Sequence, residues 1–482
     1  MKIAFLASEA TPYAKTGGLA DVAGALPKYL ARAGHEVKVI MPLYRCVRAT
    51  GLPLLKAAGD LAMDWYDGPA VFSVWEEPTG RATASFIEKN DYFERDALYG
   101  TSAGDYPDNG ERFGFFSRAA LETLKTLDFA PDILHVHDWQ AALSLAYLKF
   151  VFGEDPFFRK TKSLFTIHNL AYQGLFEPEI LGRIGLPKKL FHVEALEFFR
   201  KVSFLKAGLL YSAAINTVSP RYSREIQTPE FGCGLEGLLQ MKSDALFGIL
   251  NGADYSTWDP ASDAALVKPY TAADLDGKAA CRRDLLSAFG LPDGKKDLPV
   301  IGLVSRLAGQ KGLDILVEAL GGLFPLGVRL VILGTGEAPI EKALKDAVRR
   351  YPSFFGLRIA FDDALARKIY AGSDMFLIPS RYEPCGLTQM YSLKYGTVPI
   401  VRATGGLDDS IQEFDPATGT GNGLKFQAAE AGALLGSIRK AVRIYGQKAT
   451  WAKIVRNGMA CDFSWERASS EYIALYRKIL GE

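Results

Sequence analysis

The second half of the sequence alternates apolar, strand-like segments with amphipathic, helix-like segments, and this alternation limits the possible folds more than any other feature. It runs from about Leu298 to Val401. The predicted strands are 300–305, 329–333, 358–361, 375–379 and 398–401, and the predicted helices between them are 312–320, 340–350, 364–372 and 386–395. Strands joined by helices in this way form a parallel sheet covered on both faces, so we predict a Rossmann-like α/β domain.

The first half begins with a pattern of the same kind. Residues 2–7 form a predicted strand, a helix follows to about residue 33, and residues 36–41 form the next strand. Residues 50–110 are less regular and are predicted to form an inserted antiparallel region with loops. Because 482 residues are too many for one ordinary core, we predict two Rossmann-like domains that face a deep cleft. Breaks in regularity at 258–269 mark the candidate hinge.

Composition and charge exclude several classes of protein. Lys and Arg number 56 against 55 Asp and Glu, so no basic field suggests binding to nucleic acid or to an anionic membrane. The five cysteines are scattered without Cys-x-x-Cys spacing, which argues for a reducing compartment and against a zinc site. The first apolar segment is too short for a signal-peptide core, and no apolar window approaches the roughly 18 residues that span a bilayer. We therefore expect a cytoplasmic protein.

A glycine pair lies where the first predicted strand passes into its helix. The segment reads Lys15-Thr16-Gly17-Gly18-Leu19-Ala20-Asp21. Glycines allow the backbone to approach a ligand closely, and Lys15 offers a cation beside them. The dinucleotide motif Gly-x-Gly-x-x-Gly is not present, so a purely structural turn is the alternative.

Two further predicted strands of the first half end in polar residues. His137 and Asp138 follow one strand, and His168 follows another. Because the carboxyl ends of parallel strands meet at one edge of a sheet, these side chains are predicted to lie together and face a binding crevice. The alternative is that the histidines are hydrogen-bonded core residues, but three of the chain's five histidines fall in these two tracts. The imidazole and carboxylate groups do not recur at helical spacing, so we predict no metal site.

The second half places cations and glycine turns where strands pass into helices. Arg306 follows a predicted strand and Lys311 begins the next helix, so the two cations can hold one diphosphate from two sides. The turns at 334–336 and 386–388 suit close backbone approach to an anion. These features favour a nucleotide diphosphate. The sequence contains neither a Gly-x-x-x-x-Gly-Lys-Ser/Thr loop nor a Gly-x-Ser-x-Gly elbow, which disfavours P-loop ATP hydrolysis and α/β-hydrolase chemistry.

Glu383 lies inside the strand-to-helix turn 380–389. A carboxylate beside an anion site is unfavourable unless it binds something polar and uncharged, such as sugar hydroxyls. The alternative is that Glu383 only caps the helix that follows. Cys385 in the same turn has no base evident in the sequence, so a catalytic thiol is disfavoured.

Six ordered motifs together resemble the bacterial glycogen synthases and the related plant starch synthases. They are residues 15–21, 137–139, 168–174, 251–254, 306 with 310–312, and 383–387. The resemblance implies a GT-B fold, in which two Rossmann-like domains are followed by a C-terminal helix that crosses back to the first one. It also implies retaining transfer of glucose from ADP-glucose to the non-reducing end of an α-1,4-glucan, as in glycogen biosynthesis, without a cofactor or a metal.

The same resemblance implies domain roles and site residues. Residues 1–245 would bind the acceptor glucan and the sugar, residues 246–460 the nucleotide-sugar donor, and residues 461–482 would form the returning helix. Catalytic roles are implied for Glu383, His168, Arg306, Lys311 and Asp138. Donor-binding roles are implied for Lys15, Gly17, Gly18, Asp21, Asn251, Arg306, Lys311, Phe361, Gly386, Leu387 and Thr388, and acceptor contacts for Tyr99 and Trp139.

Two small departures from the family pattern affect only fine acceptor contacts. Gln140 stands where the family often has His, and Leu307 follows Arg306 where Thr is more usual. Two rival functions stay open. A glucan phosphorylase shares this architecture but needs pyridoxal phosphate on a lysine, and a non-catalytic glucan-binding protein would not need the diphosphate cations. The choice between ADP-glucose and UDP-glucose depends on the base pocket, for which only the resemblance favours ADP.

Overall fold

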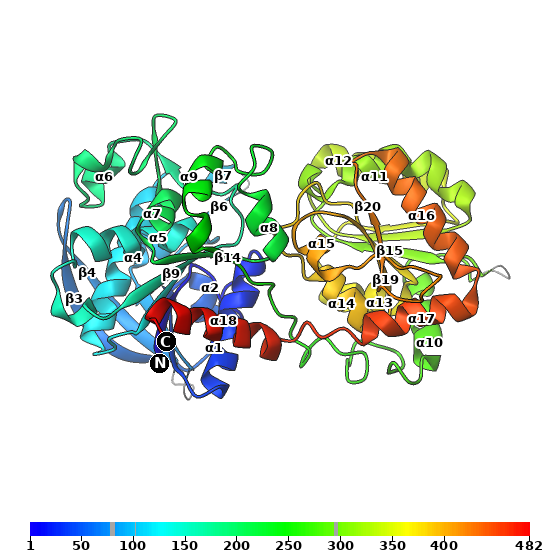
Figure 1. The fold of residues 1–482 in the computed structure, drawn as a ribbon, viewed down its shortest axis with the longest axis horizontal. Coiled ribbons are helices and arrows are strands. Elements are labelled where there is room, and N and C mark those ends of the chain that lie inside the picture. The colour runs from blue at the N-terminus through cyan, green and yellow to red at the C-terminus, as the bar shows by residue number, and fades with distance from the viewer. Residues whose placement is uncertain (78–81, 102, 294–296) are drawn as a thin grey trace. The chain divides into compact units, whose positions relative to one another are not determined.

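The computed structural model describes residues 1–77, 82–101, 103–293 and 297–482, which form two compact units. The first unit contains Met1–Val218, Ser223–Ile249 and Trp465–Glu482, and the second contains Ser219–Tyr222 and Leu250–Ser464. Each unit consists of a sheet flanked by helices (Figure 1). Among the described helices, none is long and apolar enough to cross a membrane.

The sheet of the first unit has the strand order β14-β13-β9-β8-β1-β2-β5-β4-β3 in the part of the chain described. Its parallel strands are β1 (Lys2–Leu6), β2 (Glu36–Pro42), β5 (Ala82–Glu88), β8 (Ile133–His137), β9 (Lys162–Ile167), β13 (Ala214–Thr217) and β14 (Leu246–Gly248). An antiparallel edge is added by β3 (Leu55–Trp65) and β4 (Gly68–Glu77). This edge confirms the predicted antiparallel insertion.

Helices and short strands complete the first unit. The helices are α1 (Gly18–Arg32), α2 (Arg45–Ala49), α3 (Asn90–Phe93), α4 (Asn109–Thr126), α5 (Asp138–Phe150), α6 (Ile180–Arg183), α7 (Phe204–Tyr211) and α9 (Glu236–Met241), and α8 (Pro220–Glu225) belongs to both units. The short strands are β6 (Gly100–Thr101) paired with β7 (Gly104–Asp105), and β12 (Lys201–Ser203) between β10 (Leu175–Phe176) and β11 (Glu197–Phe198). Helix α5 packs against α4, α7 and the strands β8 and β9, so it fixes the start of the segment that carries Asp138.

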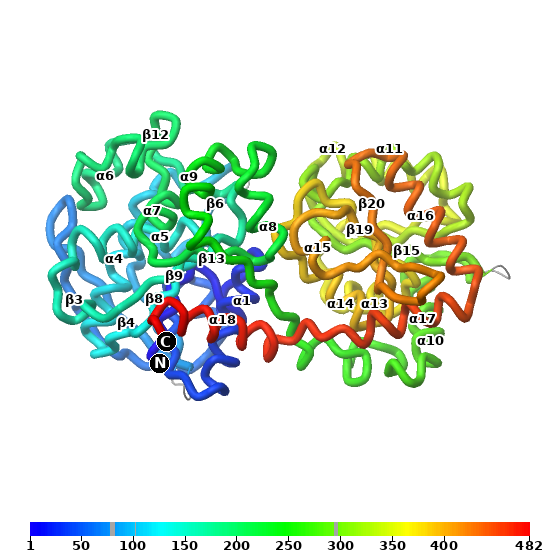
Figure 2. The backbone as a smooth tube through the Cα atoms, in the orientation of Figure 1, coloured from blue at the N-terminus to red at the C-terminus, as the bar shows by residue number. Residues whose placement is uncertain are grey.

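The C-terminal helix α18 (Trp465–Leu480) returns to the first unit, as predicted. It lies beside α1 in Figure 2 and also packs on β9. Its buried face contributes the hydroxyl of Tyr472, which accepts a hydrogen bond from Asn216 at 3.1 Å, and the hydroxyl of Tyr476, which lies 2.8 Å from Nδ1 of His135. The apolar face of this helix therefore covers part of the first unit, at α1 and β9.

The second unit has a parallel sheet with the order β17-β16-β15-β18-β19-β20 among its described residues. The strands are β15 (Val300–Val304), β16 (Arg329–Leu333), β17 (Phe355–Arg358), β18 (Met375–Ile378), β19 (Val398–Arg402) and β20 (Leu424–Phe426). The predicted strand at 358–361 is therefore displaced. A mostly apolar segment, interrupted by Arg358, extends from Phe354 to Phe361. Pairing with β16, which sets Leu330 opposite Phe355 and Leu333 opposite Arg358, selects its first part.

The helices of the second unit are α10 (Asp276–Ala288), α11 (Leu313–Leu323), α12 (Ala338–Arg350), α13 (Asp363–Gly372), α14 (Thr388–Lys394), α15 (Gly405–Ser410), α16 (Ala431–Tyr445) and α17 (Lys448–Met459). The candidate hinge at 258–269 lies inside this unit. Trp258 stacks on Tyr391 with ring centroids 4.2 Å apart, and the guanidinium of Arg367 lies 4.1 Å from the Trp258 ring. The break in periodicity therefore marks an irregular segment packed on the second unit.

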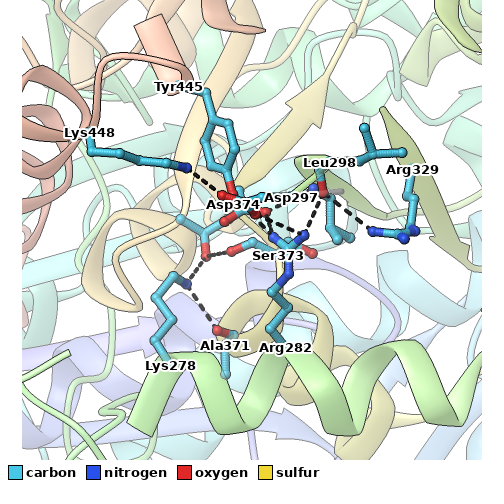
Figure 3. Close-up of polar contacts among 12 residues, drawn as sticks. Lys278, Arg282, Asp297, Leu298, Arg329, Ala371, Ser373, Asp374, Tyr445 and Lys448 are labelled. Carbon is cyan, nitrogen blue, oxygen red and sulfur yellow. Dashed lines mark hydrogen bonds and ion pairs between the residues drawn. The ribbon is translucent and has the colours of Figure 1, made fainter. Parts of the chain in front are cut away.

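A polar network ties α10 to the amino edge of this sheet (Figure 3). We call it the amino-edge network, and it consists of Lys278, Arg282, Asp297, Asp374, Tyr445 and Lys448. Asp374 pairs with Arg282 and accepts a hydrogen bond from the backbone N–H of Val300 at 2.8 Å. Lys278 donates to the carbonyls of Ala371 (2.9 Å) and Tyr395 (3.0 Å) and to the hydroxyl of Thr397 (2.7 Å). Burial lowers the pKa of Lys278 to about 7.

Candidate active site

The loop before α1 is held by one buried carboxylate of the first unit. Glu9, only 3% exposed, accepts hydrogen bonds from the hydroxyl of Thr16 (2.6 Å), the backbone N–H of Gly17 (3.2 Å) and the hydroxyl of Tyr99 (2.6 Å). A Cβ added at Gly17 or Gly18 would meet nothing within 4 Å. No neighbour in the fold therefore requires glycine at these two positions, which leaves open space for a ligand beside the backbone.

The predicted site residues in and around this loop have different partners. Lys15 forms an ion pair with Asp21 at 2.6 Å, and both side chains are partly exposed. The hydroxyl of Tyr99 is held by Ser8 (2.7 Å) as well as by Glu9, and burial raises its pKa. Tyr99 thus supports the loop through Glu9, a role that the sequence does not suggest.

Trp139, the second predicted acceptor residue, lies in the first turn of α5 among aromatic side chains. Its ring centroid is 5.1 Å from that of Phe113, 5.7 Å from Phe176 and 6.4 Å from Phe204. These contacts leave Trp139 half-buried. Its packing fixes the orientation of the indole.

Asp138 and His168 lie together at the carboxyl ends of β8 and β9, as predicted. The carboxylate of Asp138 accepts a hydrogen bond from the backbone N–H of His168 at 2.8 Å and another from that of Asn169. Burial raises the pKa of Asp138 to about 7 against these hydrogen bonds, which lower it. Asp138 also has a φ of 52°, a left-handed conformation that a non-glycine residue adopts at a cost of about 1–3 kcal/mol and that is common at functional sites.

The histidines of these tracts divide into core and site residues. His135 is fully buried, and its ring nitrogens lie 2.8 Å from the hydroxyl of Tyr476 and 2.7 Å from that of Thr166. The alternative of a hydrogen-bonded core histidine is therefore right for His135. His168 is half-buried, with Nε2 3.0 Å from Nδ1 of His137, and burial lowers its pKa to about 3. It is neutral at physiological pH.

In the second unit, Lys311 and Glu383 form what we call the carboxyl-edge pair. Their Nζ and Oε2 atoms are 2.6 Å apart, and Glu383 also accepts a hydrogen bond from the hydroxyl of Ser380 at 2.9 Å. Gly312 makes this contact possible, because a Cβ there would lie 2.0 Å from the carbonyl oxygen of Pro379. Leu387 is the N-cap of α14 and no side chain caps it, so the alternative role of Glu383 as a helix cap is wrong.

Arg306 follows β15 on the same edge and remains exposed. Its guanidinium contacts only Gln310 within the described residues, at 3.2 Å. One cation is therefore paired with a carboxylate and the other is available to solvent. A diphosphate at this edge would have to compete with Glu383 for Lys311, but with no carboxylate for Arg306 among the residues described.

The turn that carries Glu383 is supported from behind by α15. Gly405 has a φ of +45°, and a Cβ there would lie 2.0 Å from the carbonyl oxygen of Glu383. The backbone N–H of Gly406 donates to the same carbonyl at 3.1 Å. The backbone N–H groups of Leu387 and Thr388 have no acceptor among the residues described, and both residues are half-buried. They lie next to Gly386, which has a φ of +72°.

Two other predicted site residues, Asn251 and Phe361, differ in burial, and Cys385, which was not predicted to be catalytic, is buried. Asn251 is buried, and its Oδ1 has no hydrogen-bond partner in the described chain. Phe361 is 95% exposed and lies beyond β17, so nothing within its own unit holds the ring. Cys385 is buried, which raises the pKa of its thiol to about 12, and this supports the expectation that it is not a nucleophile.

Glu9 and Gly405 support the site without belonging to any predicted motif. Glu9 follows a strand and precedes a proline, and nothing in its sequence neighbourhood distinguishes it from a surface carboxylate. Gly405 and Gly406 are adjacent glycines after β19, and this pair is the feature of the sequence that could have predicted a close approach of two backbone segments.

Two protein families have models that fit this chain. The starch synthase catalytic domain fits residues 2–241, and glycosyl transferases group 1 fits residues 298–443. The chain is 48% identical to the glycogen synthase of Koribacter versatilis, over 99% of this chain and 98% of that protein, and 44% identical to that of Thermotoga petrophila, over 100% and 99%.

A solved structure agrees with these sequence relationships. The catalytic domain of Starch Synthase IV from Arabidopsis thaliana, bound to ADP and acarbose, superposes with a TM-score of 0.90 at 34% identity and covers 100% of this chain and 99% of that one. The two α/β units and the returning helix therefore define a glycosyltransferase of the GT-B class. Within that class, the chain belongs to the family of bacterial glycogen synthases and plant starch synthases.

Proposed function

We propose that this chain transfers glucose from ADP-glucose to the non-reducing end of an α-1,4-glucan, with retention of configuration, in the bacterial cytoplasm. The observation that carries the proposal is the carboxyl-edge pair, in which a lysine suited to bind a diphosphate and a carboxylate suited to bind sugar hydroxyls lie 2.6 Å apart. Such a pair can bind both halves of a nucleotide sugar. The glycogen synthases among the relatives, and the ADP in the related starch synthase, support the choice of substrate.

The second unit supplies the stabilisation of the leaving group. Arg306 and Lys311 neutralise the negative charge that builds on ADP as the glycosidic C–O bond breaks. The N–H groups of Leu387 and Thr388 donate to the phosphates beside Gly386, and Asn251 offers its unpaired amide oxygen to the donor. Once Lys311 turns to the phosphate, Glu383 is free to accept hydrogen bonds from glucose hydroxyls.

The first unit supplies contacts to the sugar and the acceptor. Asp138 accepts hydrogen bonds from sugar hydroxyls, and the neutral ring of His168 lies near the oxocarbenium-like carbon without adding a positive charge to it. Lys15 leaves Asp21 to approach the donor beside Gly17 and Gly18. Tyr99 and Trp139 order the acceptor side, in line with an acceptor role for residues 1–245 and a donor role for residues 246–460.

Retention of configuration is compatible with same-face transfer. The electron pair of the breaking bond leaves with ADP, the 4-hydroxyl oxygen of the acceptor bonds to the same face of the anomeric carbon, and its proton passes to the departing phosphate. No side chain has to act as a covalent nucleophile. Phe361 is the weakest part of the proposal, because its place near the adenine depends on the resemblance alone.

Transfer of labelled glucose into glycogen, from ADP-glucose and UDP-glucose in parallel, tests the proposal. We expect incorporation from ADP-glucose to fall about 10²–10³-fold in Lys311→Ala, because a donor to the developing charge is lost. Lys345→Ala is the matched control, since that lysine forms an exposed pair with Glu341 on α12. A protein that binds glycogen but transfers glucose from neither donor would be a non-catalytic binder, and an absorption band of pyridoxal phosphate would indicate a phosphorylase.

A further inference from the structure

Two neutral histidines share one hydrogen bond at the carboxyl edge of the first unit's sheet. His137 ends β8 and is fully buried, and its Nδ1 lies 3.0 Å from Nε2 of His168. Burial lowers the pKa of His168 to about 3 and that of His137 well below its usual range, so each ring carries one proton at neutral pH. One ring must therefore donate and the other accept.

Only two arrangements of the protons satisfy this hydrogen bond. In the first, Nδ1–H of His137 donates to a bare Nε2 of His168, whose own proton is on Nδ1. In the second, Nε2–H of His168 donates to a bare Nδ1 of His137, whose own proton is on Nε2. The arrangements therefore differ at the outer nitrogen of each ring.

The outer nitrogen of His137 distinguishes the two arrangements. Its Nε2 is buried and has no hydrogen-bond partner within the described residues. The second arrangement would leave a buried N–H without an acceptor at this position, whereas the first leaves an unused lone pair, and a buried N–H without an acceptor is the rarer and costlier defect.

Aromatic faces do not rescue the second arrangement. Phe5 and His135 lie against the His137 ring with interplanar angles of 18° and 35° and centroid distances of 5.3 and 4.1 Å. An imidazole N–H points along the plane of its own ring, so rings that face this plane at such small angles do not lie in its path. His135 does not supply an acceptor either, because both of its nitrogens are engaged by Tyr476 and Thr166.

We infer that His137 is a positioning residue that holds His168 as the Nδ1–H tautomer. His168 then offers a hydrogen-bond donor, and not an acceptor, at its outer nitrogen. This inference uses the proposed function only to identify the ligand of that nitrogen, an oxygen of the glucose being transferred. A neutral donor can hold a sugar oxygen without opposing the positive charge that develops on the anomeric carbon.

Nitrogen NMR of protein labelled with ¹⁵N-histidine tests the tautomer without substrate. The chain has five histidines, and His168→Asn identifies the His168 signals by their loss. We expect the shift of a protonated nitrogen at Nδ1 of His168 and that of a bare nitrogen at Nε2. The opposite assignment, or an average of the two, overturns the inference, and this result does not depend on whether the protein uses ADP-glucose.

Two variants of equal size test the effect on catalysis. His137→Asn keeps an N–H donor near the position of Nδ1, whereas the carboxylate of His137→Asp accepts a hydrogen bond and so favours a proton on Nε2 of His168. We expect His137→Asn to keep the wild-type tautomer and kcat within about threefold, and His137→Asp to move the proton and lower kcat about tenfold with KM for glycogen unchanged. If kcat is equal in the two variants although the His168 proton has moved in His137→Asp, the inferred effect of the tautomer on catalysis is wrong. If His137→Asp does not fold, the wild-type spectrum still decides the tautomer.

Discussion

Two ion pairs lie at opposite edges of the sheet in the second unit, and they differ in how their partners are fixed. At the amino edge, Asp374 is held by Arg282 and by the backbone N–H of Val300. At the carboxyl edge, the carboxylate of Glu383 is held by the side chains of Lys311 and Ser380 and by no backbone N–H among the residues described. Side chains can turn toward a ligand, whereas the backbone of a central strand cannot.

The comparison shows that burial alone does not identify a site. The side chains of Arg282 and Asp374 are each 16% exposed, and those of Lys311 and Glu383 are 20% and 11% exposed. What distinguishes the carboxyl-edge pair is its position after the strands and its exchangeable partners. The amino-edge network should therefore determine stability, and the carboxyl-edge pair activity.

Removing one charge at the amino edge should cause the largest loss of stability. We expect Asp374→Asn to lower the free energy of unfolding by about 3–5 kcal/mol, because the largely buried Arg282 loses its nearest carboxylate and keeps only Asp297, 3.6 Å away. Urea unfolding followed by circular dichroism measures the change. Lys448→Ala is the control, since its pair with Asp297 is exposed and should contribute at most about 1 kcal/mol. Equal midpoints for the two variants would contradict the structural role of the network.

Removing both members of the carboxyl-edge pair should separate activity from stability. In Lys311→Met/Glu383→Gln neither charge is left unpaired, so we expect the free energy of unfolding to stay within about 1–2 kcal/mol of wild type. We expect glucosyl transfer to fall at least 10²–10³-fold, because the phosphate cation is lost. A variant that unfolds in proportion to its loss of activity would show that this pair, too, is mainly structural.

Displacing the backbone of Glu383 should reduce both properties moderately. Gly405→Ala places a Cβ 2.0 Å from the carbonyl oxygen of Glu383 at a φ of +45°. We expect a loss of about 1–3 kcal/mol in stability and a fall of about tenfold in kcat as the turn moves. Gly432→Ala on α16 is the control, because a Cβ there meets nothing within 4 Å and alanine favours the helix. Wild-type kcat in Gly405→Ala would show that the turn tolerates the shift.

Titration of Lys278 should affect stability alone. Burial lowers its pKa from 10.5 to about 7, so between these values the unfolded chain binds more protons and the free energy of unfolding rises with pH. We expect the difference between wild type and Lys278→Met to change by up to about 1.4 kcal/mol per pH unit in that window. Urea unfolding at pH 7, 8 and 9 measures it, and a difference that does not vary with pH would refute it.

The parallel sheets were predictable because each strand is apolar and each is bounded by a helical period, and the clustering of Asp138 with His168 followed from the shared strand edge. The exact place of β17 was not predictable, because the mostly apolar segment of eight residues around Arg358 fits several registers and only pairing with β16 selects one. The link from Glu9 to Tyr99 joins residues 90 positions apart through a buried hydrogen bond, and no local pattern encodes it. The same holds for His135 and Tyr476, which are 341 positions apart.

Titration of Asp138, at the carboxyl edge of the first unit, should affect activity. Its pKa is raised to about 7, and the ionised carboxylate is the form that accepts hydrogen bonds from a sugar, so we expect kcat/KM to rise with pH through about 7. His168 stays neutral above about pH 3, so its titration should not contribute to the change in kcat/KM near pH 7. In the pH profile of glucosyl transfer, Asp138→Asn should lower the rate and remove the rise near pH 7, whereas His168→Gln should lower the rate and keep that rise.

The free energy of unfolding should show the opposite trend and fall as pH rises from about 4 to 7, because the folded state holds the Asp138 proton more tightly than the unfolded chain does. A step that persists in Asp138→Asn would assign the titration to another group, and the distinction between the two edges would then rest on the ion pairs alone.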